Sequence, residues 1–266
     1  MSSFLTRVAV VAAGLPIVLF GAYYGGWYLA GLVLFAAVVG LHEFYRLARS
    51  LRPLVLAGYG SAVGALLGVQ LGGPTWMLGG FLLVLPLAFV FAVVAETRQS
   101  ATVAVATTVL GAAWVGLGLA PLILIRDLED HGRLALLTVL VTVFVADTLA
   151  YIGGRLAGRH RMTPTVSPGK TWEGFVFGAV GGVLTTWIAL YKEDLFDDGW
   201  RPFFFGGVIV LAAVFGDLFE SLVKRDLGAK DSGGLLLGHG GVLDRVDSLL
   251  FAAPAAYFAL LALTDL

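Results

Sequence analysis

Residues 203–223 read FFFGGVIVLAAVFGDLFESLV, and the polar stretch KRDLGAKDSGGLLLGHGGVLDRVD follows directly at residues 224–247. The first stretch is long and apolar enough for a membrane-spanning helix, which needs about 20 residues. Between residues 221 and 247 the chain gathers four aspartates, four basic residues and six glycines. Such a segment between two apolar stretches predicts a polar site at a membrane face. Phosphate groups and a divalent cation are ligands that need this mixture.

The whole chain has the composition of an integral membrane protein. Of its 266 residues, 59% are hydrophobic and only 13% are charged, whereas a soluble domain carries about 25% charged residues. There is no cysteine, which excludes a disulfide framework and thiol chemistry. The first apolar segment lacks a clear cleavage site, so we expect a retained helix there and not a signal peptide. We expect no nucleic-acid partner.

The apolar pattern predicts an all-α, polytopic membrane protein with about nine transmembrane helices and two polar cytoplasmic loops. We expect one membrane domain over residues 1–266, with N-terminal helices in 1–140 and a catalytic half in 141–266. Only Gly25 and Gly26 separate the first two spans, so one or two spans can be read there. The expected spans are 8–23, 27–45, 54–72, 76–95, 101–125, 134–154, 174–191, 203–223 and 246–264.

The basic residues are distributed unevenly between the loops. With nine spans, 13 of the 17 lysines and arginines fall on one side of the membrane. The positive-inside rule places that side, with the N-terminus and both long polar loops, in the cytoplasm. We therefore expect a protein of the cell's inner (cytoplasmic) membrane whose site faces the cytoplasm. Glu43 and Arg46, at the end of the second expected span, are interpreted as interfacial residues.

Two carboxylates lie inside expected spans. Asp147 and Asp217 are about 12 Å and about 10 Å from the cytoplasmic ends of their helices, at 1.5 Å per residue. A charged group at such depth costs roughly 3 kcal/mol on insertion scales and is usually functional. We expect both to face a shared, water-filled cavity open to the cytoplasm. The alternative is that each supports a hydrogen-bond network between helices.

The spacing of the acidic residues indicates a cation site. Asp217, Ser221 and Lys224 lie at i, i+4 and i+7, on one stripe of a helix. A hard cation with oxygen ligands explains four acids within a short stretch more simply than helix capping does. Asp244 and Asp247 could alternatively serve only the positive end of the last helix. The candidate metal ligands are Asp217, Asp231, Asp244 and Asp247.

Both polar loops contain features suited to phosphate. The first loop, residues 155–174, is expected to be irregular because of its prolines and glycines. Its segment Ser167–Thr171 places a hydroxyl, a turn and Lys170 before a helix, which is a plausible phosphate cradle, although it is not a Walker A loop. The alternative is a basic loop that touches anionic lipid headgroups. In the second loop, Gly240 and Gly241 permit close backbone approach to a ligand.

These residues resemble the phosphatidate cytidylyltransferase family, also called the CDP-diacylglycerol synthases. The resemblance covers about residues 145–248 and is carried by two groups of positions. One departure is Leu237, which stands where a proline or a small residue is usual. The upstream group is Asp147, Ala150, Tyr151, Gly154, Arg155, Gly158, Pro164, Ser167, Pro168, Lys170, Thr171, Glu173 and Gly174; the downstream group is Ser221, Lys224, Arg225, Lys230, Asp231, Gly233, His239, Gly240, Gly241, Asp244, Arg245 and Asp247.

The resemblance implies an enzyme of phospholipid biosynthesis that transfers a cytidylyl group from CTP to phosphatidic acid. The products are CDP-diacylglycerol and pyrophosphate, and Mg²⁺ is the implied cofactor, with room for a second cation. The implied partners are CTP, phosphatidic acid and the lipid bilayer, and a homodimer is plausible. The residues assigned to catalysis are Asp147, Lys170, Lys230, Asp231, His239 and Arg245; those assigned to substrate binding are Ser167, Lys170, Ser221, Lys224, Arg225, Gly240 and Gly241.

Two other functions remain open from the residues. A CTP-dependent lipid kinase acting on a polyprenol or phytol would release CDP instead of pyrophosphate, and the HGG-x-x-D-R-x-D ending argues against it. An ion-coupled transporter would also need intramembrane carboxylates. Transporters often carry inverted repeats, and we find no repeat in this sequence.

Overall fold

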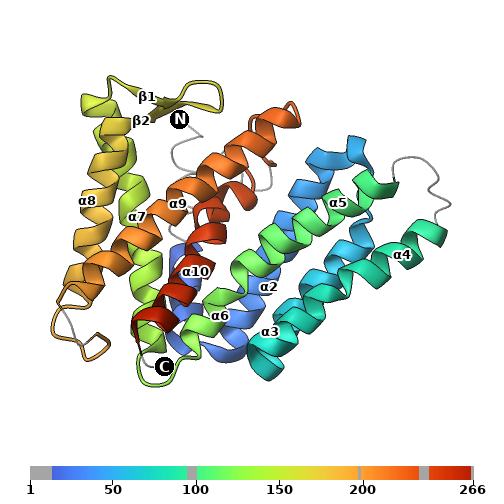
Figure 1. Ribbon diagram of the computed structural model, residues 1–266, viewed down its shortest axis with the longest axis horizontal. Coiled ribbons are helices and arrows are strands. Elements are labelled where there is room, and N and C mark those ends of the chain that lie inside the picture. Colours follow the sequence, from blue (N-terminus) through green and yellow to red (C-terminus); the bar gives the residue numbers. More distant parts are fainter. Residues whose placement is uncertain (1–13, 95–100, 197–198, 234–239, 265–266) are drawn as a thin grey trace. The chain divides into compact units, whose positions relative to one another are not determined.

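The computed structural model describes residues 14–94, 101–196, 199–233 and 240–264. Within these residues, seven helices are long and apolar enough to cross a membrane. The chain is therefore an all-α, multi-pass membrane protein, as expected. It folds as two compact units: the N-terminal unit holds residues 1–127 and 227–246, and the C-terminal unit holds residues 128–226 and 247–266. Figure 1 labels the helices of both units.

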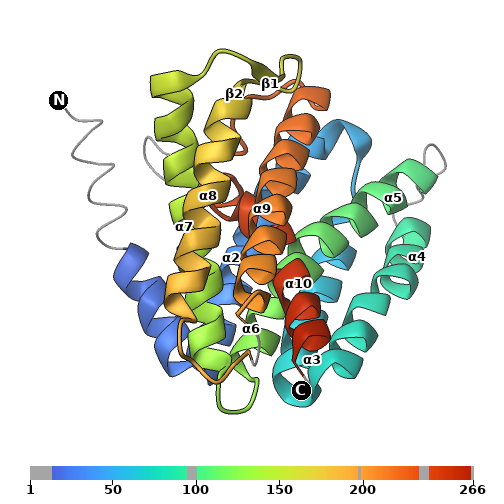
Figure 2. The ribbon, with the colours of Figure 1, turned by 60° about the vertical axis from the view of Figure 1, so that its left-hand side comes forward.

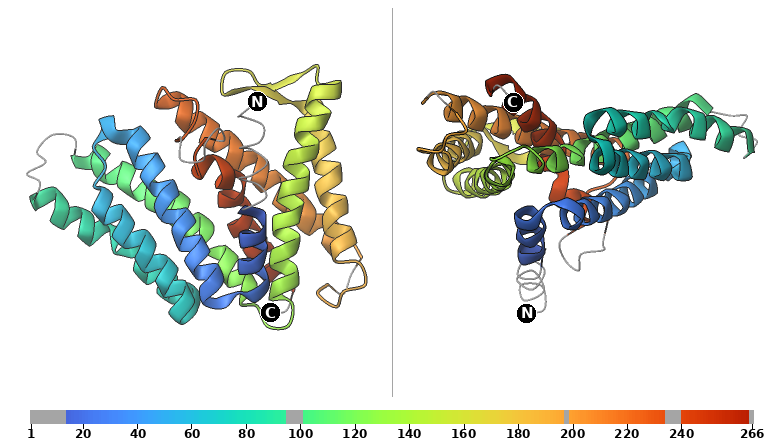
Figure 3. Two further views of the ribbon diagram at one scale, coloured as in Figure 1. Left: turned by 180° about the vertical axis from the view of Figure 1, so that it is seen from behind. Right: turned by 90° about the horizontal axis from the view of Figure 1, so that it is seen from below.

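The N-terminal unit is a helical bundle in which α3 packs against α2 and α4 (Figure 3). A short helix, Gly14–Tyr24, precedes it. A π-helical turn interrupts the last long helix of the unit. The elements are α2 (Gly26–Leu47), a 3₁₀ turn (Ala48–Leu51), α3 (Val55–Leu82), α4 (Val84–Val94), α5 (Ala101–Gly111), the π turn (Ala112–Leu117) and α6 (Pro121–Arg126).

Tyr45 shows how tightly this bundle packs. Its ring lies against Gly58 of α3 and Gly111 of α5, where a Cβ atom on either glycine would overlap the ring. Its hydroxyl donates a hydrogen bond of 2.8 Å to the carbonyl oxygen of Thr108. Because these two glycines have no side chains, the aromatic ring of Tyr45 on α2 can pack against both α3 and α5.

Two places account for the difference between the seven long apolar helices of the described residues and the nine expected spans. Residues 55–94 form one continuous apolar stretch of 40 residues. Its backbone nevertheless leaves helical geometry at Gly72 and Gly73, and Gly80 packs directly on Gly64, so the chain turns back there. The other difference lies at the start, because the first expected span begins among residues 8–13, outside the described residues.

The C-terminal unit is built on α7 (Gly132–Ala157), α8 (Trp172–Ala189) and α9 (Arg201–Asp226), followed by α10 (Leu243–Leu263), which belongs to this unit from Asp247 onward. Helices α7, α8 and α9 lie side by side (Figure 2). Three glycines of α8, spaced four apart, face α7: Gly174, Gly178 and Gly182. Without side chains they allow the two backbones to approach closely, as in membrane helix pairs generally.

The loop between α7 and α8 is more ordered than its prolines and glycines predicted. It contains an antiparallel hairpin of β1 (Arg161–Thr163) and β2 (Ser167–Thr171). The Thr171 hydroxyl then caps α8 by accepting a hydrogen bond from the Gly174 N–H, at 3.1 Å. Glu173 accepts from the backbone N–H groups of Arg159 and His160, which ties the loop to the helix. Local polar contacts thus supply the order that composition did not reveal.

Candidate active site

An ion pair within the C-terminal unit joins the hairpin to a membrane helix. The Lys170 ammonium, on β2, lies 2.7 Å from Oδ2 of Asp217, on α9. Both side chains are partly buried, with exposed fractions of 23% and 34%. The pair therefore gives the Asp217 carboxylate a neutralising partner, and the Lys170 ammonium itself is buried.

Further carboxylates surround this ion pair. Asp147 of α7 is within electrostatic reach of both Asp217 and Lys170, and it interacts with the Ser248 hydroxyl of α10. Asp247 is within reach of Asp147, Asp217 and Glu220. The expected proximity of Asp147 and Asp217 is thus observed within one unit. The expected water-filled cavity between them stays a prediction.

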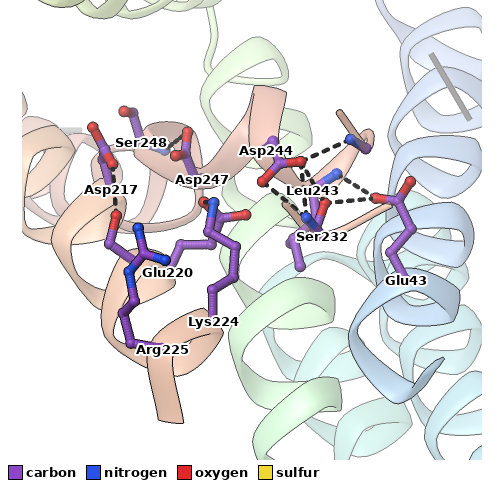
Figure 4. A network of polar contacts seen from close by, with 12 residues as sticks. Glu43, Asp217, Glu220, Lys224, Arg225, Ser232, Leu243, Asp244, Asp247 and Ser248 are labelled. Carbon is purple, nitrogen blue, oxygen red and sulfur yellow. Dashed lines mark hydrogen bonds and ion pairs between the residues drawn. The ribbon is translucent and has the colours of Figure 1, made fainter. Parts of the chain in front are cut away.

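The end of α9 continues the polar stripe. The Lys224 ammonium lies 2.6 Å from Oε2 of Glu220, whose side chain is almost wholly buried. One turn earlier, the Ser221 hydroxyl is 3.5 Å from Oδ1 of Asp217. Arg225 donates to the carbonyl oxygen of Val166 at 3.4 Å, which connects the helix end to the hairpin. Figure 4 shows the Lys224 ammonium beside the Glu220 carboxylate, with Asp217 farther along the same helix.

The donors in this cluster suit a hard cation by their chemistry. They are carboxylate oxygens, the ligands that Mg²⁺ prefers, and Mg²⁺ usually takes only one or two of them and keeps several waters. Among the described residues, no group of three or more His, Cys, Asp or Glu side chains is arranged as a metal site. A site with fewer carboxylates, such as Asp217 and Asp247, remains compatible with that finding.

A second polar network lies within the N-terminal unit and centres on Asp244. Its Oδ2 accepts hydrogen bonds from the Gly241 N–H at 2.7 Å and from the Ser232 hydroxyl at 2.8 Å. The Ser232 N–H also donates to this carboxylate, at 3.0 Å. Hydrogen bonds to a charged group each contribute about 1.5–3 kcal/mol. Asp244 thus joins Ser232 to Gly241 through hydrogen bonds; the predicted metal role of Asp244 stays a prediction.

Glu43 completes this network and corrects one interpretation. It was expected to be interfacial, yet its side chain is only 4% exposed. Its two carboxylate oxygens accept from the N–H groups of Val242, at 3.0 Å, and Leu243, at 2.8 Å. Figure 4 shows this side chain reaching from α2 toward the start of α10. The interfacial interpretation was wrong because a buried acceptor serves the first N–H groups of the helix.

The remaining predicted residues lie at the surface or outside the described part. Lys230, Asp231 and Arg245 are exposed residues of the N-terminal unit. Ser167 is half-buried on β2. His239 lies outside the described residues, and its role stays a prediction.

The sequence contained a signal for Glu43 but none for Ser232. Glu43 is an acid at the end of a long apolar stretch, within GLHEFYRL, and a carboxylate that becomes buried there needs a partner. The sequence does not identify the residues that contact Glu43, because Glu43 is 189 positions from Ser232 and 200 positions from Leu243. Tertiary structure was needed to bring them together.

Fold and site together define a class: a multi-pass membrane protein with a cluster of carboxylates and ammonium groups on its helices. Comparison with known proteins gives the family. The model of the cytidylyltransferase family matches residues 5–263. The chain belongs to this family.

Three similar proteins are each named as a phosphatidate cytidylyltransferase. A phosphatidate cytidylyltransferase of Helicobacter pylori is 48% identical over 126 residues, which are 47% of this chain and 46% of that protein. One from the Arabidopsis thaliana chloroplast is 43% identical over 48% of this chain and 34% of that protein. The chain therefore spans about half the length, or less, of these first relatives. One from Brucella melitensis is 32% identical over 97% of this chain and 93% of that protein.

Proposed function

We propose that the protein transfers a cytidylyl group from CTP to phosphatidic acid, giving CDP-diacylglycerol and pyrophosphate. The observation that carries this proposal is the Lys170–Asp217 ion pair, set among further carboxylates on membrane helices. The relatives named phosphatidate cytidylyltransferase support the choice of substrates. An anionic lipid and a nucleoside triphosphate both need positive charge close to the membrane, and Lys170 and Lys224 supply it.

The chemistry requires positioning more than proton transfer. A phosphate oxygen of phosphatidic acid attacks the α-phosphorus of CTP, and the bond from that phosphorus to the bridging oxygen breaks as pyrophosphate leaves. The attacking oxygen is already anionic, so no general base has to remove a proton. Lys170 and Lys224 would neutralise charge on the phosphates, and electrostatic stabilisation of this kind is commonly the largest catalytic contribution.

Mg²⁺ is the proposed cofactor. Asp217 and Asp247 would hold it, directly or through water, and when bound it would neutralise phosphate charge and assist departure of pyrophosphate. Asp147 would then keep Lys170 oriented, because it lies within electrostatic reach of that ammonium. The oxygen-only donor set supports Mg²⁺ over softer metals.

We further propose nine membrane crossings, in the cytoplasmic membrane, with Lys170 and Lys224 facing the cytoplasm. The reversal at Gly72 and Gly73 supports two crossings within residues 55–94. The excess of lysine and arginine in one set of loops supports the orientation. A homodimer belongs to the same proposal, and light scattering of the purified protein in detergent tests it.

A product assay tests the function. Purified protein in detergent receives phosphatidic acid, CTP labelled in the cytidine, and Mg²⁺. We expect lipid-extractable cytidine label together with an equal amount of pyrophosphate. Release of CDP on addition of a polyprenol, without pyrophosphate, would instead establish a lipid kinase.

A further inference from the structure

Glu43 contacts both ends of the glycine-rich segment. On one side its carboxylate accepts from the backbone N–H groups of Val242 and Leu243. On the other side it lies 3.3 Å from the Ser232 hydroxyl. One side chain of α2 therefore holds the residues that precede and follow residues 233–241 (Figure 4).

Glycines make this close approach feasible. A Cβ atom at Gly233 or at Gly241 would overlap the Glu43 carboxylate. At Gly241 it would also overlap the Ser232 hydroxyl. The backbone at both ends of the segment thus lies directly against one buried acid, and a side chain larger than hydrogen would push it away.

The charges fit this arrangement. Glu43 and Asp244 together accept from the N–H groups of Gly241, Val242 and Leu243 at the start of α10. A helix N-terminus stabilises nearby negative charge. The Ser232 hydroxyl has a single proton, and its contact with Asp244 is shorter than its contact with Glu43, so the hydroxyl mainly serves Asp244. Glu43 therefore holds the residues after the segment through the N–H groups of Val242 and Leu243, and it holds the residues before it through close contact with Gly233 and the Ser232 hydroxyl.

We propose that Glu43 is a positioning residue: it clamps both ends of the segment and so fixes the groups that the family motif places around it, Lys230, Asp231 and Arg245. It acts through the backbone and does not touch substrate. The consequence for turnover rests on the proposed function, whereas the clamp itself does not. The rate of an enzymatic reaction falls steeply when a positioned group moves, by about 100-fold for a displacement of about 1 Å.

The test uses the full-length protein in detergent and the variant Glu43→Gln, which keeps the side-chain size but removes the charge. Trypsin cleaves after Lys230 and Arg245, on either side of the clamp, and mass spectrometry measures both cleavage rates. We expect about tenfold faster cleavage and, in the product assay, a kcat lowered by about tenfold with a smaller change in KM for CTP. Glu43→Asp, which restores the charge with shorter reach, should recover part of the kcat.

Two further variants keep the test decisive. Glu129→Gln changes an exposed acid in a turn and should match the wild type in both measurements. Ser232→Ala removes a contact on the side that precedes the segment and leaves the backbone hydrogen bonds of Glu43 in place. It carries the test if Glu43→Gln does not fold: cleavage after Lys230 should rise severalfold, and a wild-type rate there would overturn the clamp.

The outcomes separate the clamp from the reaction. Wild-type cleavage rates in Glu43→Gln would overturn the clamp. Faster cleavage with unchanged kcat would make Glu43 purely structural and overturn its positioning role. A wild-type protein that makes no CDP-diacylglycerol would refute the proposed function and with it the catalytic consequence, while the cleavage rates would still decide the clamp.

Discussion

At the scale of single residues, the two polar networks use their carboxylates differently. In the C-terminal unit, the Asp217 carboxylate forms an ion pair with the Lys170 ammonium, the group that we propose binds phosphate. In the N-terminal unit, Asp244 and Glu43 accept hydrogen bonds from backbone N–H groups, so they hold the chain in place. Carboxylates thus pair with an ammonium group in one unit and accept hydrogen bonds from backbone N–H groups in the other.

Removing the Lys170 ammonium should weaken nucleotide binding. We expect Lys170→Ala to raise KM for CTP about tenfold, the equivalent of about 1.4 kcal/mol, because a positive charge is lost beside Asp217. Steady-state kinetics with varied CTP measure this. The control is Lys192→Ala, an exposed lysine in a turn. An unchanged KM in Lys170→Ala would assign Lys170 to structure only.

Asp231→Asn and Asp244→Asn should both abolish turnover but differ in stability. Asp244 accepts at least three protein hydrogen bonds, so replacing its carboxylate with the amide of asparagine should lower the free energy of unfolding by about 1–3 kcal/mol. Asp231 is exposed, and its variant should unfold like the wild type. Thermal unfolding in detergent, with the product assay, distinguishes the two. Normal turnover in either variant would remove that residue from the reaction.

At the scale of elements, the glycines of α8 set its distance from α7. A Cβ atom at Gly178 would overlap the carbonyl oxygen of Ala146 and the side chain of Ala150. Because α8 follows directly on β2, its position also fixes that of Lys170. Helix packing by small residues is therefore the element-level support of the Lys170–Asp217 pair.

A single methyl group should test this packing. We expect Gly178→Ala to destabilise the protein by about 1–3 kcal/mol through overpacking. Gly207→Ala, on α9, places its Cβ in open space and should be neutral or slightly stabilising, since alanine favours helices more than glycine. Thermal unfolding of both variants gives the comparison. Equal unfolding temperatures would show that α7 and α8 can move apart without cost.

At the scale of the whole molecule, the proposed orientation can be tested cleanly because the chain has no cysteine. Single cysteines at Ser50 and Glu129 lie in loops that nine crossings place on opposite sides. We expect a membrane-impermeant thiol reagent added outside intact cells to label Glu129→Cys and to spare Ser50→Cys. Labelling of both from outside would contradict the proposed topology.

The sequence by itself determined that the chain spans the membrane, because long apolar stretches have few other stable folds. It also determined the family, through the spacing of residues such as Ser221, Lys224 and Asp244. It did not predict the hairpin at residues 161–171, since composition alone favoured irregular structure. Local hydrogen bonds around Glu173 decided that order.

Only the tertiary structure decided what Glu43 does and where Lys170 points. Glu43 meets Leu243 across 200 positions of sequence, and the meeting depends on how the helices of one unit pack. The apolar pattern fixes which residues enter the membrane but not which helix faces meet. Buried polar groups need partners, so packing assigns each carboxylate either to backbone N–H groups or to an ammonium.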